Sequence, residues 1–287
     1  MSNNLPKDAK NKSTIKLSDE TSMYTVINVV GPKAVRLMSE LSNSDINLQP
    51  MMYKKINVGY ASDVLIMSYT HTGESGYCLY VPSEYALHVY EEIMKIGIDY
   101  GAKDVGTLTQ RFMRIERFIP FWGEELTSFT TPLEAGMERF VSFSKKEEFI
   151  GKQALLNQKK IGIKKRLVMF LLDDIETDKD IFAWGNEPIY RNSEYIGTVT
   201  SAGYGFTSDK IVCLGFIRHP KNAKNQPITT DFIMDASAHY HIDIAGRLFS
   251  ATPYINVPHY LEQREKEQRA ASLKYRPSSV LSVKKRQ

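Results

Sequence analysis

Hydrophobic and polar positions alternate differently in the two halves of the chain. In the first half, β-branched runs are followed by stretches in which apolar residues recur every three or four positions, which is typical of strands followed by amphipathic helices. This pattern predicts strands at 24–30, 54–58, 64–69 and 77–81 and helices at 33–41, 84–98 and 107–117. On the longest helix it places these residues on the buried face: Ala86, Leu87, Tyr90, Ile93 and Met94.

After about Lys160 short strands follow one another without long helices. The predicted strands are 166–172, 188–191, 194–200, 211–216, 228–234, 240–245 and 248–255. Asn192-Ser193 between two of them predicts a tight hairpin turn. Short strands at this spacing favour a small antiparallel barrel.

The fold class predicted from these patterns is α+β, followed by an all-β barrel. We expect an α+β domain at 23–159 and a barrel domain at 160–258. The flanking segments, a polar leader at 1–22 and a basic tail at 259–287, are predicted to be disordered.

A glycine-bounded link, Thr70-His71-Thr72-Gly73-Glu74-Ser75-Gly76, joins the predicted strands 64–69 and 77–81. Glycine at the corners favours a hairpin, and the loop is long enough for its side chains to reach a ligand.

Charge and composition exclude few function classes. The 37 basic and 33 acidic residues leave a net charge of +4, too weak a field to predict nucleic-acid or membrane binding. Much of the excess lies at 264–287, where a solvated tail is favoured over contact with an acidic partner or a nucleic acid; its basic residues are Arg264, Lys266, Arg269, Lys274, Arg276, Lys284, Lys285 and Arg286.

Targeting and redox signals are sparse. Two cysteines do not form a disulfide framework, which indicates a reducing compartment such as the cytosol or the mitochondrial matrix. No apolar run approaches the roughly 18 to 20 residues of a membrane span. The first twenty residues contain no Arg and resemble neither a secretory signal nor a transit peptide.

Catalytic and metal motifs are also sparse. His239 and His241 alternate on a predicted strand, but no third ligand is near, so surface positions are favoured over a metal site. The acidic loop at 173–180 is more typical of a solvated turn than of a cation site. We predict no catalytic residue and no metal ligand.

Five motifs in the first half occur in a specific order and spacing. They are Thr72-Gly73-Glu74-x-Gly76, Leu79-Tyr80-Val81-Pro82, Arg114-Ile115-Glu116, Thr131-Pro132-Leu133-Glu134-Ala135-Gly136 and Phe149-Ile150-Gly151-Lys152-x-Ala154-Leu155. This series resembles the folate-binding aminomethyltransferase family, which includes the glycine-cleavage T protein and the C-terminal regions of dimethylglycine and sarcosine dehydrogenases. The resemblance implies a partial aminomethyltransferase-type folate-binding fold, with the barrel as its second domain.

Further motifs are closer to one branch of that family. They include Met113-Arg114-Ile115-Glu116-Arg117-Phe118, Phe121-Trp122-Gly123 and Trp184-Gly185-Asn186-Glu187-Pro188-Ile189-Tyr190-Arg191-Asn192. They resemble the regulatory subunits of pyruvate dehydrogenase phosphatase, catalytically unassigned relatives of dimethylglycine dehydrogenase. The resemblance implies that the partner is the phosphatase catalytic subunit and that the chain changes the response of this subunit to Mg²⁺. It also implies that the compartment is the mitochondrial matrix.

Candidate pocket residues follow from the resemblance: His71, Glu74, Cys78, Gln110, Arg114 and Trp122. Folate-using relatives carry a carboxylate at the position of Cys78 and an Arg at that of Gln110. If each charge-assisted contact contributes roughly 1.5 to 3 kcal/mol, losing both weakens folate binding by about 10² to 10⁴. Tetrahydrofolate is therefore disfavoured, and no cofactor is predicted.

Four of these positions, and Glu116 beside them, have plainer interpretations. Glu74 and Arg114 are equally typical of a salt bridge or a cap, whereas Trp122 is more typical of a domain plug than of a ligand stack. Cys78 is most typical of a small buried hydrophobic residue. Glu116, two positions after Arg114 on the same helix, is expected to point the opposite way.

The resemblance also has missing parts. Aminomethyltransferases carry an acidic catalytic residue upstream of the turn that matches Gly31–Ala34, and the dehydrogenases carry a flavin-binding (FAD) domain upstream. Here a polar leader stands in their place, so we expect the chain to correspond to a C-terminal portion of such proteins. The interpretation is a non-catalytic regulatory module; the alternatives are a folate-dependent aminomethyltransferase or a fragment of a dehydrogenase-like flavoenzyme.

Overall fold

The structure is a computed structural model that describes residues 18–173, 175–176, 179–223, 225–258, 261–263, 266–267 and 270. The chain forms two compact units. Residues up to Thr70 with Ser75–Ala102 form the first, and His71–Glu74 with the residues from Lys103 onward form the second. The compact units therefore divide at 70–75 and 102–103, whereas a domain boundary at 159–160 remains a prediction. Most of the predicted tail and most of the leader, residues 1–17, lie outside the described residues.

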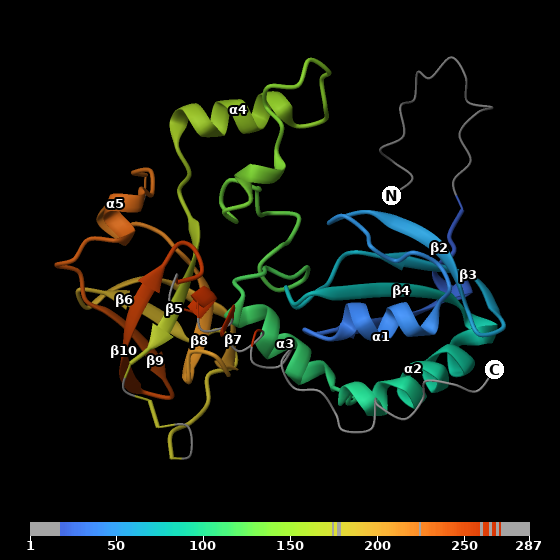
Figure 1. Ribbon diagram of the computed structural model, residues 1–287. Helices are drawn as coiled ribbons and strands as arrows, with labels where there is room; N and C mark the ends of the chain where they lie inside the picture. Colours follow the sequence, from blue (N-terminus) through green and yellow to red (C-terminus); the bar gives the residue numbers. More distant parts are fainter. Residues whose placement is uncertain are drawn as a thin grey trace. The chain divides into compact units, whose positions relative to one another are not determined.

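The first unit is built on a four-stranded antiparallel sheet in the order β1-β4-β3-β2 (Figure 1). The strands are β1 (Tyr24–Val30), β2 (Tyr53–Val58), β3 (Ala61–Met67) and β4 (Gly76–Pro82). The hairpin predicted between the third and fourth strands is confirmed, since Leu65 pairs with Tyr80 and Met67 with Cys78.

Two helices supply the rest of the first unit's core. They are α1 (Ala34–Leu41) and α2 (Ala86–Tyr100), accompanied by the short helices η3 (Thr21–Met23) and η4 (Ser83–Tyr85). Alternate residues of β4 share a core with α1; this core includes Tyr77, Leu79, Val81, Leu37 and Met38. Period two on the strand and period 3.6 on the helix place these residues on facing sides.

The buried face of α2 differs from the prediction. Its buried residues are Val89, Ile93 and Gly97, whereas Leu87 is exposed. Gly97 lies on this buried face, where a Cβ would lie 2.8 Å from that of Ala102 and 3.6 Å from Leu37 Cδ1 of α1.

The second unit contains a closed antiparallel barrel in the order β10-β5-β8-β7-β6-β9 (Figure 1). Its strands are β5 (Arg166–Leu172), β6 (Pro188–Arg191), β7 (Glu194–Gly205), β8 (Lys210–Ile217), β9 (Tyr240–Ile244) and β10 (Arg247–Tyr254). Asn192 and Ser193 form the predicted β6–β7 turn with φ of 49° and 65°, the left-handed conformation that a two-residue hairpin needs.

Strand β5 is apolar on both sides for a structural reason. Val168, Phe170 and Leu172 fill the barrel interior. Leu167, Met169 and Leu171 form an outer cluster with Ile115 of helix α3 (Thr107–Glu116). The barrel wall thus has one face in its own core and another under α3.

One predicted strand is wrong. Residues 228–234 form no strand but contain the helix α5 (Thr230–Ile233). The hydroxyl of Thr229 accepts a hydrogen bond from the Phe232 amide at 3.2 Å, so a local N-cap outweighs the β-branched composition.

The remaining elements of the second unit are η5 (Glu138–Phe140), α4 (Lys152–Ile161) and η6 (Lys221–Ala223). Helix α4 was not predicted as a helix. Among the described residues, none of the helices combines the length and apolar character that crossing a membrane requires.

Candidate functional site

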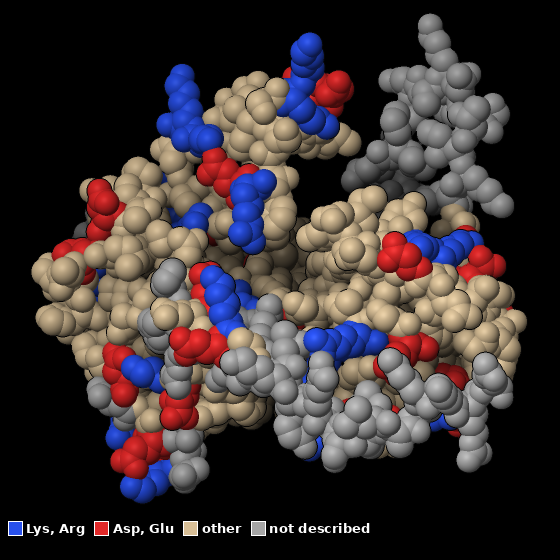
Figure 2. Space-filling model, in the orientation of Figure 1, with Lys and Arg blue, Asp and Glu red and all other residues tan. Residues whose placement is uncertain are grey.

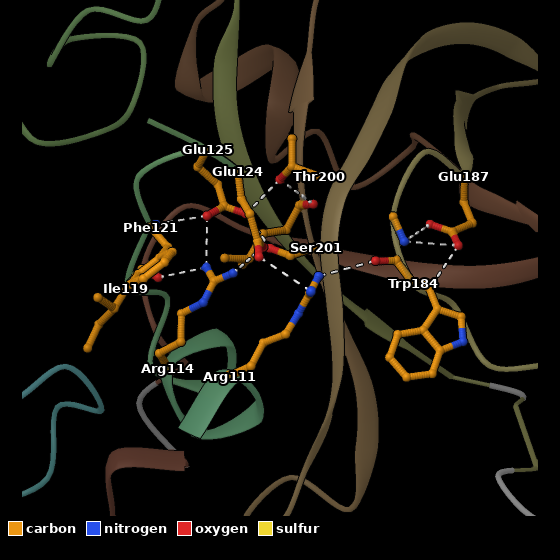
Figure 3. Close-up of polar contacts among 12 residues, drawn as sticks. Arg111, Arg114, Ile119, Phe121, Glu124, Glu125, Trp184, Glu187, Thr200 and Ser201 are labelled. Carbon is orange, nitrogen blue, oxygen red and sulfur yellow. Dashed lines mark hydrogen bonds and ion pairs between the residues drawn. The ribbon is translucent and has the colours of Figure 1, made fainter. Parts of the chain in front are cut away.

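A buried polar cluster in the second unit joins α3, the loop 119–126 and β7 (Figure 3). Its centre is Glu125, whose side chain is fully buried, and Arg114 lies beside it at 4% exposure. Arg114 Nη1 lies 2.8 Å from Glu125 Oε2. Burying a charge is costly unless it is paired and hydrogen-bonded, so the remaining partners of this pair matter.

Both oxygens of Glu125 are fully engaged. Oε2 also accepts the backbone N–H of Phe121 at 2.9 Å. Oε1 accepts the hydroxyl of Thr200 at 2.8 Å and the hydroxyl of Ser201. Two successive strand residues normally face opposite sides, but β7 is shifted in register between Val199 and Ser201, so Thr200 is the extra residue of a bulge.

Arg114 is held by a second carboxylate and a carbonyl. Its guanidinium pairs with Glu124 Oε2 and donates to the carbonyl of Ile119 at 3.1 Å. Arg111, one helical turn earlier, lies 3.3 Å from Glu124 and donates to the carbonyl of Trp184 at 3.2 Å. Of the interpretations predicted for Arg114, the structure shows the salt bridge.

Glu116 points away from this cluster, as its spacing from Arg114 predicts. Its Oε1 accepts the backbone N–H groups of Thr207 at 2.9 Å and Ser208 at 2.7 Å, in the β7–β8 turn. Gly205 permits this approach, because a Cβ there would lie 2.7 Å from the same oxygen.

A cavity of about 380 Å³ lies beside Glu116. Its lining residues come from α3, the β7–β8 turn, the hairpin loop and the segment after β10; they are Glu74, Thr109, Met113, Glu116, Arg117, Phe206, Thr207, Val257 and Leu261. Glu74 and Arg117 form an ion pair of 3.6 Å at its edge. A mostly apolar cavity with a few placed charges is typical of a small-molecule site.

The predicted site residues are only partly brought together. Of the six, Glu74 alone lines the cavity. Gln110 is half-buried on α3, and His71 lies in the hairpin loop within the second unit. Trp122 is 70% exposed, so its interpretation as a plug is wrong.

Cys78 belongs to the first unit. It is buried in β4, and burial raises the pKa of its thiol. A neutral, buried thiol is a poor nucleophile and a poor metal ligand.

Sequence reasoning missed the main residues of both features. Glu124 and Glu125 were not singled out, and Thr200, Ser201 and Thr207 carry no motif. The available signal was the pair Arg111 and Arg114, three residues apart on one helix, which predicts a shared acidic partner.

The described residues of the acidic loop and the His-x-His pair form no metal-type cluster. Asp173 pairs with Lys210 at 2.7 Å, and Asp180 pairs with Arg247. In the described part of the chain, no group of three or more His, Cys, Asp or Glu residues is arranged to hold a metal ion.

Two family models match the sequence. The GCVT N-terminal domain matches residues 1–145, and the glycine cleavage T-protein C-terminal barrel domain matches residues 165–260. These matches confirm the predicted fold class, an aminomethyltransferase-type domain followed by a barrel.

Curated relatives fall into a regulatory and an enzymatic group. The mitochondrial pyruvate dehydrogenase phosphatase regulatory subunit of Mus musculus is 46% identical over 86% of this chain and 28% of its own length. An aminomethyltransferase of Thermoanaerobacter pseudethanolicus is 35% identical over 74% of this chain and 56% of its own. The mitochondrial dimethylglycine dehydrogenase of Mus musculus is 32% identical over 71% of this chain and 23% of its own.

A solved structure shares the fold. The aminomethyltransferase T of the glycine cleavage system from Bartonella henselae superposes with a TM-score of 0.61 at 21% identity, over 77% of this chain and 55% of its own. The chain spans between about a quarter and just over half of the length of these relatives.

Proposed function

Because the chain belongs to the glycine cleavage T-protein family, we propose that it acts as a non-catalytic regulatory module of a pyruvate dehydrogenase phosphatase and changes its response to Mg²⁺. The observation that carries this proposal is the similarity to the mouse regulatory subunit, which extends over most of the chain. The names of that relative and of the dehydrogenase favour a mitochondrial compartment.

The buried cluster supports a structural role for Arg114 and Glu125 rather than a chemical one. Arg114 and Glu125 form an ion pair, and both carboxylate oxygens of Glu125 accept hydrogen bonds from donors of the protein itself. Groups that are already paired and buried have no capacity left for a reacting ligand. Cys78, with its raised pKa, offers no thiolate at neutral pH.

The cavity beside Glu116 supports a sensing role for a small ligand. Only Oε1 of Glu116 is held by backbone N–H groups, and among the described residues Oε2 has no hydrogen-bond donor. A carboxylate oxygen next to a mostly apolar cavity favours a ligand that offers N–H donors, because a charge-assisted hydrogen bond would satisfy it. We propose that the cavity is the sensor site of the module.

The test measures phosphatase activity across a Mg²⁺ titration with and without the purified chain. We expect the chain to co-purify with the phosphatase catalytic subunit and to shift its half-saturating Mg²⁺ concentration. A phosphatase that neither retains the chain nor changes its Mg²⁺ dependence would overturn the proposal.

A folate-dependent enzyme is the second candidate, and the cavity and the aminomethyltransferase relatives favour it. Tetrahydrofolate binding measured by fluorescence or thermal shift tests it, with Glu116→Gln as the matched variant. Micromolar binding that the variant loses would establish a folate site. If the chain does not bind folate at millimolar concentration, the folate-enzyme candidate is eliminated and the regulatory proposal is the one that remains.

A further inference from the structure

A strongly basic segment of the second unit connects the loop motif at 131–136 to the first barrel strand, β5. We call residues 137–165 the basic arm; it contains η5, a loop and α4. It holds eight basic and three acidic residues, a net charge of +5 in a chain whose total is +4. The basic residues are Arg139, Lys145, Lys146, Lys152, Lys159, Lys160, Lys164 and Lys165, and the acidic ones are Glu138, Glu147 and Glu148.

Helix α4 of this arm contributes no residue to the hydrophobic core clusters of the described residues. None of its ten residues is buried. Figure 1 shows α4 apart from the barrel strands of its own unit. Its contacts are peripheral: Gln158 donates to Glu134 at 3.4 Å, and Lys159 pairs with Glu138. Isolated helices shorter than about 12 to 15 residues are marginal in water, so α4 has much to gain from packing against another surface.

Large apolar side chains of the arm are left in solvent. Ile150 is 87% exposed, Ile161 is 70% exposed and Phe140 is 66% exposed. Ile150 immediately precedes Gly151, the N-cap of α4, where an apolar residue usually packs onto the first helical turn. Here that contact is not made, and Ile150 remains available to a partner.

Cations lie beside the aromatic rings of the arm, and the Arg139 guanidinium lies 4.9 Å from the ring centre of Phe140. Lys145 and Lys152 lie 5.5 Å and 6.0 Å from the ring centre of Phe149, and Lys159 lies 5.2 Å from that of Phe143. In Figure 2 blue Lys and Arg side chains project from α4 and the loop beside it, with acidic groups among them. The arm is therefore an apolar surface with a mainly positive border.

We propose that the basic arm is a docking surface for an acidic protein face with an apolar centre, which in the proposed function belongs to the phosphatase. An apolar centre with charge-complementary borders is the anatomy of a specific protein interface. A protein fits better than a phosphate polymer or an anionic membrane, because Glu138, Glu147 and Glu148 lie within the same surface and repel phosphate. This inference rests on the proposed function for the identity of its partner.

The test compares the full chain with two charge-reversal variants in binding to the phosphatase catalytic subunit. Lys146→Glu/Lys160→Glu/Lys164→Glu changes three exposed lysines of the arm, whereas Lys55→Glu/Lys95→Glu/Lys103→Glu makes the same charge change elsewhere. We expect the arm variant to weaken binding at least about tenfold at 0.15 M salt and the control variant to bind like the unchanged chain. Ile150→Asp/Ile161→Asp tests the apolar centre and should weaken binding without lowering Tm, since both side chains are exposed.

The outcomes separate the inference from the proposed function. If the unchanged chain binds the phosphatase and shifts its Mg²⁺ dependence but the arm variant binds equally well, the inference alone fails. If both charge variants weaken phosphatase binding equally, the effect comes from the overall charge of the chain, and the inference also fails. No binding by the unchanged chain overturns both. Arm-dependent binding to phosphatidylserine vesicles or to a single-stranded oligonucleotide, without phosphatase binding, assigns the arm to those ligands instead.

Discussion

Arg114 and Glu125 form an ion pair of 2.8 Å in which both side chains are almost completely withdrawn from solvent. Eleven residues separate them, and the contact ties α3 to the loop that follows it. Through Thr200 and Ser201 the same carboxylate ties both to the barrel wall. One side chain thus joins three elements of the second unit.

Removing Glu125 should destabilise the second unit strongly. Glu125→Ala leaves the guanidinium of Arg114 buried with only the partly exposed Glu124 to pair with, and breaking a buried pair costs about 3 to 5 kcal/mol. Urea unfolding followed by far-UV circular dichroism measures the change in free energy of unfolding. The matched control is Glu148→Ala, at an exposed position, which should stay within about 0.5 kcal/mol. Equal effects of the two substitutions would show that the buried pair has no special weight.

Gly205 should tolerate no side chain. A Cβ there would lie 2.2 Å from Ser208 Oγ and 2.7 Å from Glu116 Oε1, so Gly205→Ala must displace the carboxylate beside the cavity. We expect a loss of about 1 to 3 kcal/mol of stability, measured by urea unfolding. Gly106→Ala is the control, because a Cβ at Gly106 meets nothing within 4 Å. Gly106 is the N-cap of α3, where alanine is a poorer cap than glycine, so the control should cost no more than about 0.5 to 1 kcal/mol. A stable Gly205→Ala protein would mean that the β7–β8 turn yields more easily than the contacts indicate.

The two cysteines should make the protein less stable at alkaline pH. Burial raises the pKa of the Cys78 and Cys213 thiols in the folded state, whereas unfolded thiols ionise near about 8.5. When the folded-state pKa of a thiol is raised, its stabilising contribution is complete at pH values below the unfolded-state pKa. That contribution is lost as the pH rises from the unfolded-state pKa towards the folded-state pKa. The urea midpoint should therefore fall between about pH 8.5 and 10.5, and less steeply in Cys78→Ala.

Thiol reagents give an independent check of the same burial. At pH 8 neither thiol should react with Ellman's reagent until urea unfolds the chain. Rapid reaction of the folded protein would contradict the burial of at least one of them.

Ser193→Gly should stabilise the barrel. Ser193 has φ of 65° in the β6–β7 turn, a conformation that costs an L-residue roughly 1 to 2 kcal/mol and glycine almost nothing. Because glycine loses more chain entropy on folding, we expect a net gain of about 0.5 to 1 kcal/mol in thermal unfolding. Ser193→Thr should change stability in the opposite direction, since a β-branched residue fits a positive φ poorly.

Local patterns predicted most of the elements of this fold. Strands β1, β5 and β6 have the predicted bounds. The β-branched run of β1 ends at Gly31-Pro32, the apolar run of β5 ends at Asp173, and β6 ends at the Asn192-Ser193 turn. The prediction at 228–234 failed because the Thr229 cap gives the backbone a local partner that composition does not reveal. On α2, Leu87 was placed inside and Val89 was overlooked, because apolar residues occur on more than one side of this helix and the pattern alone does not select the buried one.

The site was less predictable because its contacts are distant in sequence. The opposite directions of Arg114 and Glu116 follow from their spacing on a helix. Their partners do not: Thr200 lies 75 residues from Glu125, and Thr207 lies 91 residues from Glu116. Only the folded barrel brings these residues together.

Thr200 also sets the phase of strand β7. Before Thr200 the odd-numbered Val199 faces the barrel interior, whereas after it the even-numbered Ala202 and Tyr204 face the interior. The side on which odd and even residues lie is therefore exchanged at Thr200. The glycines at 203 and 205 consequently fall on the outer side, where Phe112 and Glu116 approach the backbone. If the strand ran through Thr200 in regular pairing, without the bulge, its second half would turn over: glycines would line the interior, and an alanine and a tyrosine would collide with α3. The extra residue Thr200 in β7 therefore places glycines, rather than larger side chains, where α3 packs against the barrel.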